Sequence, residues 1–147
     1  MTKEILAQFE ETTNEFCALA KSLPVADIHQ FPSPGEWSQA YVIHHLADCD
    51  AHFLVRFLNV LSVNKPAIVS FDEEVFPVAL RYEGRSVAVS LAAIEASRAH
   101  LVDILKQLNP EDWNRTGIHS ELGELTLSEI LQSTINHRVN HIDQIRS

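Results

Sequence analysis

Residues 126–145 read TLSEILQSTINHRVNHIDQI, and this stretch indicates a long amphipathic helix. It begins at Thr126, and Glu129 follows three residues later, which is the S/T-x-x-E pattern of a capping box. Apolar residues then recur at three- and four-residue steps, as on a helix with one side facing a core. The residues expected to face inward are Leu127, Leu131, Ile135, Val139 and Ile142. The stretch therefore predicts a helix that must bury one face against other elements.

Three further stretches show the same helical spacing. They run from Thr2 to Leu23, from Ser38 to about Val63, and from Ser86 to Leu108, and prolines follow soon after each of them. Four such helices pack most economically as a four-helix bundle, so we predict an all-α single domain over residues 1–147. The connections 64–85 and 109–125 are long. Because long loops in compact domains tend to be crossovers or lids, we expect both to cover a site.

The composition narrows the class of partner. The 147 residues include 20 acidic and 11 basic side chains, and the net charge of -9 disfavours nucleic acid and anionic membranes. The N-terminus lacks the apolar core of a signal peptide, and no apolar run is long enough to cross a bilayer. The two cysteines, Cys17 and Cys49, do not have the spacing of a metal-binding pair. We therefore expect a cytoplasmic protein with a small-molecule partner.

Histidine is the unusual residue, with eight in the chain. His137 and His141 are four residues apart in the last predicted helix, so they lie on one side of it, and Gln144 continues the row. The row follows the margin of the apolar stripe and should face a neighbouring helix. His45 occupies a similar margin in the second helix, so three imidazoles could share a divalent ion such as zinc or nickel.

Other readings of these residues are open. Histidines at a core margin are often packing residues that bind no metal. Cys49 and His52 continue the row that His45 begins, and they are alternative ligands. The acidic run Asp72-Glu73-Glu74 is interpreted as a solvated loop edge.

Several short motifs, in this order along the chain, resemble the DinB superfamily. They are Pro34-Gly35-Glu36-Trp37-Ser38, His44-His45-Leu46-Ala47-Asp48, Gly123-Glu124-Leu125-Thr126-Leu127 and His137-x3-His141-x2-Gln144. The resemblance implies a four-helix bundle, often homodimeric, with a divalent metal held by His45, His137 and His141. His45 is chosen over His44 because the ligand of the family directly precedes the Leu-Ala-Asp run. One departure is Asn140, where many members have a further histidine.

Three charged residues fall within the predicted apolar stripes: Asp50, Arg98 and Arg138. Since unpaired buried charges are costly, we expect Asp50 to pair with Arg138 or Arg98, although Arg138 could instead extend to water. Arg98 is a catalytic candidate, because its guanidinium could bind a carboxylate of a substrate or thiol carrier. His119, in the second long loop, is a second catalytic candidate as a proton carrier.

These observations lead to two functional hypotheses. The first is a metal-dependent enzyme in which a three-histidine ion activates water or a low-molecular-weight thiol, giving a hydrolase or a thiol S-transferase. The sequence shows no evident general base, which slightly favours thiol transfer. The second is a metal- or ligand-binding module without turnover.

Overall fold

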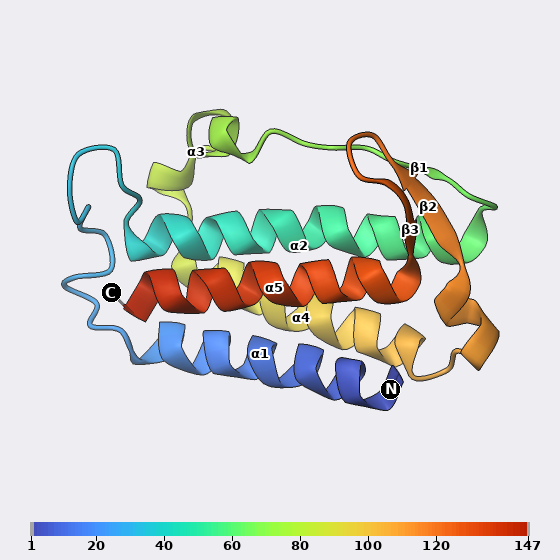
Figure 1. The fold of residues 1–147 in the computed structure, drawn as a ribbon. Helices are drawn as coiled ribbons and strands as arrows, with labels where there is room; N and C mark the ends of the chain where they lie inside the picture. The colour runs from blue at the N-terminus through green and yellow to red at the C-terminus, as the bar shows by residue number, and fades with distance from the viewer. Residues whose placement is uncertain (1, 147) are drawn as a thin grey trace.

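The computed structural model describes residues 2–146 and shows a bundle of four long helices (Figure 1). They are α1 (Thr2–Ser22), α2 (Gln39–Ser62), α4 (Val87–Leu105) and α5 (Leu127–Arg146). Both α1 and α2 pack against α4 and α5, so the four helices surround a common interior. The predicted four-helix bundle is confirmed. Within residues 2–146, no helix combines the length and apolar character needed to cross a membrane.

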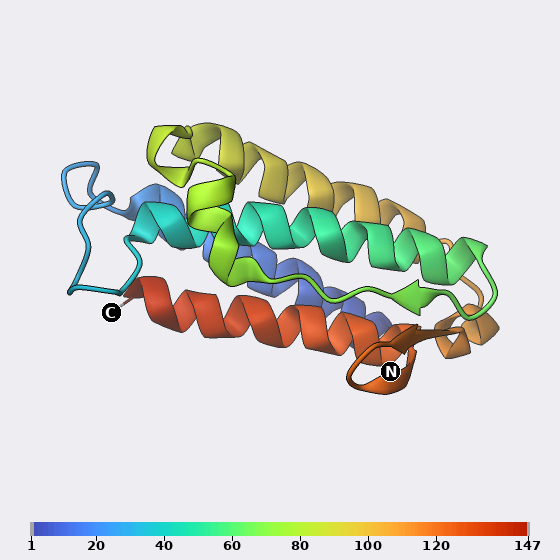
Figure 2. The ribbon, with the colours of Figure 1, turned by 90° about the horizontal axis from the view of Figure 1, so that it is seen from above.

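The connection between α2 and α4 is a crossover that returns along the bundle. Since α2 and α4 run in the same direction, the chain must travel back beside α2 before α4 can begin (Figure 2). This segment contains β1 (Ala67–Ile68), the 3-10 helix η1 (Glu73–Val75), α3 (Phe76–Ala79) and the 3-10 helix η2 (Tyr82–Gly84). At its end Arg85 donates two hydrogen bonds, of 2.7 and 2.9 Å, to the carboxylate of Asp48. This bidentate pair ties the end of the crossover to α2.

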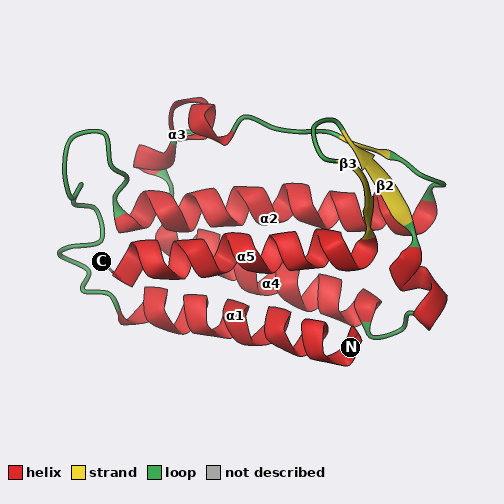
Figure 3. Ribbon diagram, in the orientation of Figure 1, coloured by secondary structure: helices red, strands yellow, loops and turns green. Residues whose placement is uncertain are grey.

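The connection between α4 and α5 contains the 3-10 helix η3 (Pro110–Asn114) and the strands β2 (Thr116–His119) and β3 (Gly123–Thr126). β2 pairs antiparallel with β3 and parallel with β1, forming a small sheet at one end of the bundle (Figure 3). The sheet was not predicted, because strands of two to four residues are too short to show a periodic pattern. Gly117 lets β2 approach β1 closely, since a Cβ at position 117 would lie 2.8 Å from Ile68 Cδ1.

Two of the predicted helix starts are confirmed by their hydrogen bonds. Ser38 Oγ accepts the amide of Tyr41 at 3.1 Å, and Thr126 and Glu129 form the reciprocal bonds of a capping box, each 3.2 Å long. The inward face of α5 differs at one position, because Val139 is 38% exposed. A four-residue step advances 40° around a helix, so the row that starts at Leu127 has turned off the core face by Val139.

Arg138 occupies that inward position and forms a buried ion pair with Asp50. Its Nη2 lies 2.7 Å from Asp50 Oδ2, and both side chains are 2% exposed. Burial raises the pKa of Asp50 to about 6, while the neighbouring Arg138 guanidinium opposes this shift. The expected pairing of Asp50 is therefore formed with Arg138, which does not extend to water.

Candidate metal centre

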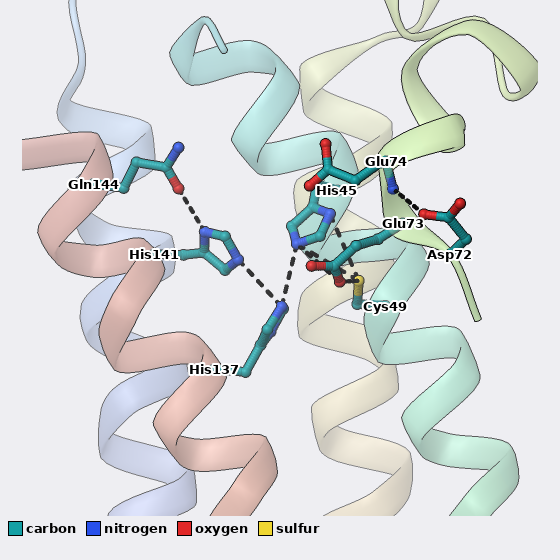
Figure 4. A network of polar contacts seen from close by, with 8 residues as sticks. All are labelled: His45, Cys49, Asp72, Glu73, Glu74, His137, His141 and Gln144. Atoms are coloured by element: carbon teal, nitrogen blue, oxygen red, sulfur yellow. Dashed lines mark hydrogen bonds and ion pairs between the residues drawn. The ribbon is translucent and has the colours of Figure 1, made fainter. Parts of the chain in front are cut away.

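Three histidine side chains from two helices converge in the interior of the bundle (Figure 4). His45 comes from α2, and His137 and His141 come from successive turns of α5. The Nε2 atom of His137 lies 3.1 Å from Nε2 of His45 and 3.1 Å from Nε2 of His141. The same kind of nitrogen from each ring thus points toward one position, which is the arrangement of a metal-ligand set.

The spacing of these nitrogens fits a divalent ion. With metal–nitrogen distances of about 2.0–2.1 Å, neighbouring ligands lie about 3.3–3.4 Å apart in a tetrahedral site and about 2.9 Å apart in an octahedral one. The observed 3.1 Å falls between these values. Neutral imidazole suits zinc, nickel and similar ions, and a set of three leaves coordination positions for water or substrate.

Neighbouring side chains orient the rings. Nδ1 of His141 lies 2.7 Å from Oε1 of Gln144, so the ring donates its Nδ1 proton and keeps the Nε2 lone pair for a ligand role. The Trp37 ring packs against His45 with their centroids 4.9 Å apart. Gln144 thus orients the ring of His141, and Trp37 packs against that of His45. Neither contact occupies the position on which the three Nε2 atoms converge.

Glu73 and Cys49 also lie at this position. Glu73 Oε2 is 3.8 Å from Nε2 of His45 and 3.6 Å from Sγ of Cys49, and Sγ is 3.6 Å from the same histidine nitrogen. Donor atoms of His45, Cys49, Glu73 and His137 all lie within 4.8 Å of one another. The interpretation of Glu73 as part of a solvated loop edge is therefore wrong: the crossover brings its carboxylate to the histidines.

Burial keeps the three imidazoles and the Cys49 thiol uncharged. Desolvation is the main cause that lowers the pKa of His45 to about 4 and that of His137 to about 2, and neighbouring His141 adds to both shifts. The pKa of His141 is also lowered by burial. Burial raises the pKa of the Cys49 thiol far above its usual value, so without a metal this thiol stays protonated. The three imidazoles are thus in the form that binds a metal.

These shifts predict acid sensitivity of the metal-free protein. Below pH 6.5 the imidazoles of the unfolded chain become protonated, whereas those of the folded protein stay neutral. The free energy of unfolding therefore falls as the pH decreases toward 4. His44, whose pKa burial lowers to about 4, acts in the same sense, whereas Asp50 acts oppositely between about 6 and 3.8. Urea midpoints measured from pH 7 to pH 4.5 should therefore decrease. A midpoint that stays constant would show that the rings protonate freely in the folded protein.

An open cavity adjoins the histidines and has a volume of about 990 Å³. It lies between the segment connecting α1 and α2, the C-terminal part of α5, and η1 of the crossover. We call it the histidine cavity. It is lined by Asp27, Gln30, Phe31, Pro32, Gly35, Glu36, Trp37, Gln39, Val42, His45, Glu73, Glu74, His141 and Gln144. Two of the three converging histidines, His45 and His141, thus line a cavity with room for a small molecule.

Two other histidines of α2 point elsewhere. His44 is buried against α4, where its Nδ1 lies 2.7 Å from Ser90 Oγ. Its different direction from His45 follows from the 100° turn between successive helix residues. His52 stacks on Phe71 with centroids 4.2 Å apart and has no contact with the three rings. Of the alternative ligands considered from the sequence, the structure brings only Cys49 to the site.

The two catalytic candidates, Arg98 and His119, are not brought to the histidines. Arg98 faces α1, where its Nη1 donates to Asn14 Oδ1 at 2.7 Å, because α4 and α5 lie diagonally across the bundle. His119 is the last residue of β2, and its Nδ1 accepts the amides of Glu121 and Leu122 at 3.1 Å each. No residue of the connection 109–125 lines the cavity beside the histidines, so the expectation that it covers the site is wrong, and neither Arg98 nor His119 is assigned a role there.

Comparison with known proteins identifies relatives along most of the chain. An Oceanobacillus iheyensis protein named "Putative metal-dependent hydrolase" is 29% identical over 113 residues, which cover 77% of this chain and 65% of that protein. A Bacillus mycoides protein of the same name is 28% identical, with 100% of this chain and 87% of that protein covered. The chain thus spans slightly less than two thirds of the first relative and most of the second.

Solved structures show the same fold. One is YfiT from Bacillus subtilis, described as "a probable metal-dependent hydrolase with an unusual four-helix bundle topology". It superposes with a TM-score of 0.88 at 22% identity, and the superposition covers 99% of this chain and 83% of the YfiT chain. The mycothiol-dependent maleylpyruvate isomerase superposes with a TM-score of 0.80 at 13% identity and covers 99% of this chain and 60% of its own.

The family model of the DinB superfamily matches residues 8–145, which include α2, α4, most of α1 and α5, and the three converging histidines. The chain belongs to the DinB superfamily.

Proposed function

We propose that this protein is a metal-dependent hydrolase in which His45, His137 and His141 hold a divalent ion. The observation that carries the proposal is the convergence of three Nε2 atoms, 3.1 Å apart around His137, beside the Glu73 carboxylate at an open cavity. The hydrolase names of the relatives agree with it. Zinc and nickel are the expected metals, since the nitrogens are those of neutral imidazoles.

Each residue of the site has a distinct task in this proposal. A divalent ion, when bound, supplies Lewis acidity that brings the pKa of water or a thiol toward neutrality. Glu73, whose Oε2 lies 3.8 Å from His45 Nε2, is placed to accept the proton that the attacking water loses. Gln144 holds His141 by the Nδ1 hydrogen bond, and the histidine cavity receives the substrate. Glu73 thus supplies the general base that the sequence did not reveal.

Replacing Glu73 by glutamine tests the assignment. Glutamine has the same shape and cannot accept the proton, so zinc-loaded Glu73→Gln should hydrolyse neutral esters or amides at least about 100-fold more slowly than the wild type. Both proteins are screened on one panel, and their zinc content is measured alongside. Glu83→Gln, which changes a glutamate of the same crossover that does not line the histidine cavity, is the matched control and should stay near the wild-type rate. Equal rates for Glu73→Gln and the wild type would exclude Glu73 as the base.

Thiol transfer is a second proposal for the same site. The histidine cavity, about 990 Å³ in volume, has room for a low-molecular-weight thiol together with an electrophilic substrate. Adding such thiols to the zinc-loaded protein with electrophilic test substrates separates this reaction from hydrolysis. If fully metallated protein turned over neither panel, the chain would be a metal- or ligand-binding module.

Two further properties of the protein, its compartment and its oligomeric state, are proposed. Cys17 and Cys49 are both free and buried, which suits a reducing compartment, so we place the protein in the cytoplasm. We also propose a homodimer, as the resemblance to the DinB superfamily suggests. Sedimentation at micromolar concentration would distinguish a dimer from a monomer.

A further inference from the structure

The charged side chains that line the histidine cavity are all acidic. They are Asp27, Glu36, Glu73 and Glu74, and no lysine or arginine is among the described residues of the lining. The chain as a whole has 11 basic residues, and none of those that the structure describes lines this cavity. The acidic groups come from two separate segments that both line the cavity, the connection between α1 and α2 and the crossover.

These carboxylates are not neutralised by the protein. Among residues 2–146, Asp27, Glu36 and Glu74 have no lysine, arginine or histidine within ion-pair distance. Figure 4 shows Glu73 and Glu74 on the side of His45, whereas Asp72 is turned away and accepts the amide of Glu74 at 3.1 Å. The negative charge is thus directed toward the cavity and is available to a ligand.

A bound metal does not cancel this charge. Four carboxylates carry four negative charges, and a divalent ion held by three neutral imidazoles contributes two positive ones. The cavity therefore remains negative when it is loaded. A concave site lined by one sign of charge attracts the opposite sign and repels its own.

Aromatic side chains stand beside the carboxylates. Phe31 is 54% exposed, and it lines the cavity together with Trp37, which packs on His45. Aromatic faces bind organic cations through the ring quadrupole, and this attraction adds to that of nearby carboxylates. The three converging histidines, one of them fully buried, independently mark the cavity as a ligand site.

We propose that the substrate carries a positively charged organic group, such as an ammonium, next to the bond that is cleaved. The metal centre would act on the reacting bond while Glu36, Glu74 and the aromatic rings bind the cation. This inference rests on the proposed hydrolase function and adds its substrate class. It also disfavours anionic thiol carriers, because the arginine expected to bind their carboxylate lies at the α1–α4 contact.

Choline and 3,3-dimethylbutan-1-ol form a suitable pair of probes, because they have the same shape and hydroxyl group and differ only by the charge. Calorimetric titration of the zinc-loaded protein at low ionic strength should show choline binding about tenfold more tightly than the neutral alcohol. The preference should shrink in Glu36→Gln/Glu74→Gln and persist in Glu111→Gln/Glu121→Gln. The second pair has the same change in net charge, in η3 and the β2–β3 turn, away from the cavity.

The acetate esters of the two alcohols separate this inference from the proposed function. Preferential binding of choline without hydrolysis of either ester would support the substrate class and contradict the hydrolase proposal. Hydrolysis of both esters with equal kcat/KM, together with equal binding of the two alcohols, would support the hydrolase and overturn the cationic substrate. If both double variants reduced the preference for choline equally, the preference would be due to net charge alone. That result would also overturn the inference.

Discussion

Replacing Arg138 by methionine is expected to lower the free energy of unfolding by about 3–5 kcal/mol. Asp50 and Arg138 are each 2% exposed at the side chain, and Nη2 and Oδ2 are 2.7 Å apart. Without the guanidinium, Asp50 would keep a carboxyl group in the core with no charge partner. Burial already raises the pKa of Asp50 to about 6, so the carboxyl group would then take up a proton at higher pH.

Urea denaturation of the metal-free proteins measures this effect, and Arg146→Met is the matched control. Arg146 lies on the same helix and also binds a carboxylate, that of Glu15, at 2.7 Å, but the two side chains are 55% and 49% exposed. The control should lose less than about 1 kcal/mol. The double variant Asp50→Leu/Arg138→Met should recover part of the loss, because it leaves no buried charge. Similar losses for Arg138→Met and Arg146→Met would contradict the role given to burial.

Replacing His137 by alanine is expected to weaken zinc binding by at least about 1,000-fold. Its Nε2 is the central donor, 3.1 Å from the donors of both His45 and His141. Mutation of a residue that only orients a metal ligand already lowers the metal affinity roughly 10–100-fold, so the loss of a ligand should lower it further. Because the metal binds only the folded protein, zinc at about 100 times its Kd should also stabilise the wild type by about 2.7 kcal/mol, and this gain should vanish in the variant.

Elemental analysis of untagged protein purified without chelator gives the first comparison, and competition with a chromophoric chelator gives the affinity. His52→Ala is the control, since His52 lies on the same side of α2 but stacks on Phe71. It should bind zinc as the wild type does. Stoichiometric zinc in His137→Ala, at wild-type affinity, would show that the three imidazoles are packing residues.

The helices and the pairing of His137 with His141 could be predicted from the sequence because both depend on spacing along one chain segment. A period of 3.6 residues places apolar side chains on one face, and the i, i+4 spacing places His137 and His141 in one row. The helix caps at Ser38 and Thr126 are equally local, since donor and acceptor are three residues apart. The choice of His45 over His44 came from the resemblance to the DinB superfamily. In the structure His45 contacts His137, whereas His44 contacts Ser90.

Contacts between distant segments could not be predicted in this way. Arg98 and Arg138 are both arginines within apolar stripes, and only the packing of α4 against α1 and of α5 against α2 directs Arg138 to Asp50 and Arg98 to Asn14. The small sheet likewise depends on the crossover, which brings β1 beside β2. The paired residues Ile68 and His119 are 51 positions apart, and the strands are too short to show a pattern.

The sequence by itself determined four amphipathic helices, their caps, and the histidines that lie on their inner margins, because those features follow from local backbone geometry and burial of apolar surface. The tertiary structure alone decided that Glu73 reaches the histidines and that the cavity beside them is acidic. Both depend on a crossover that must run back along α2 before α4 can begin in the same direction, and this return path places an acidic loop beside the converging histidines.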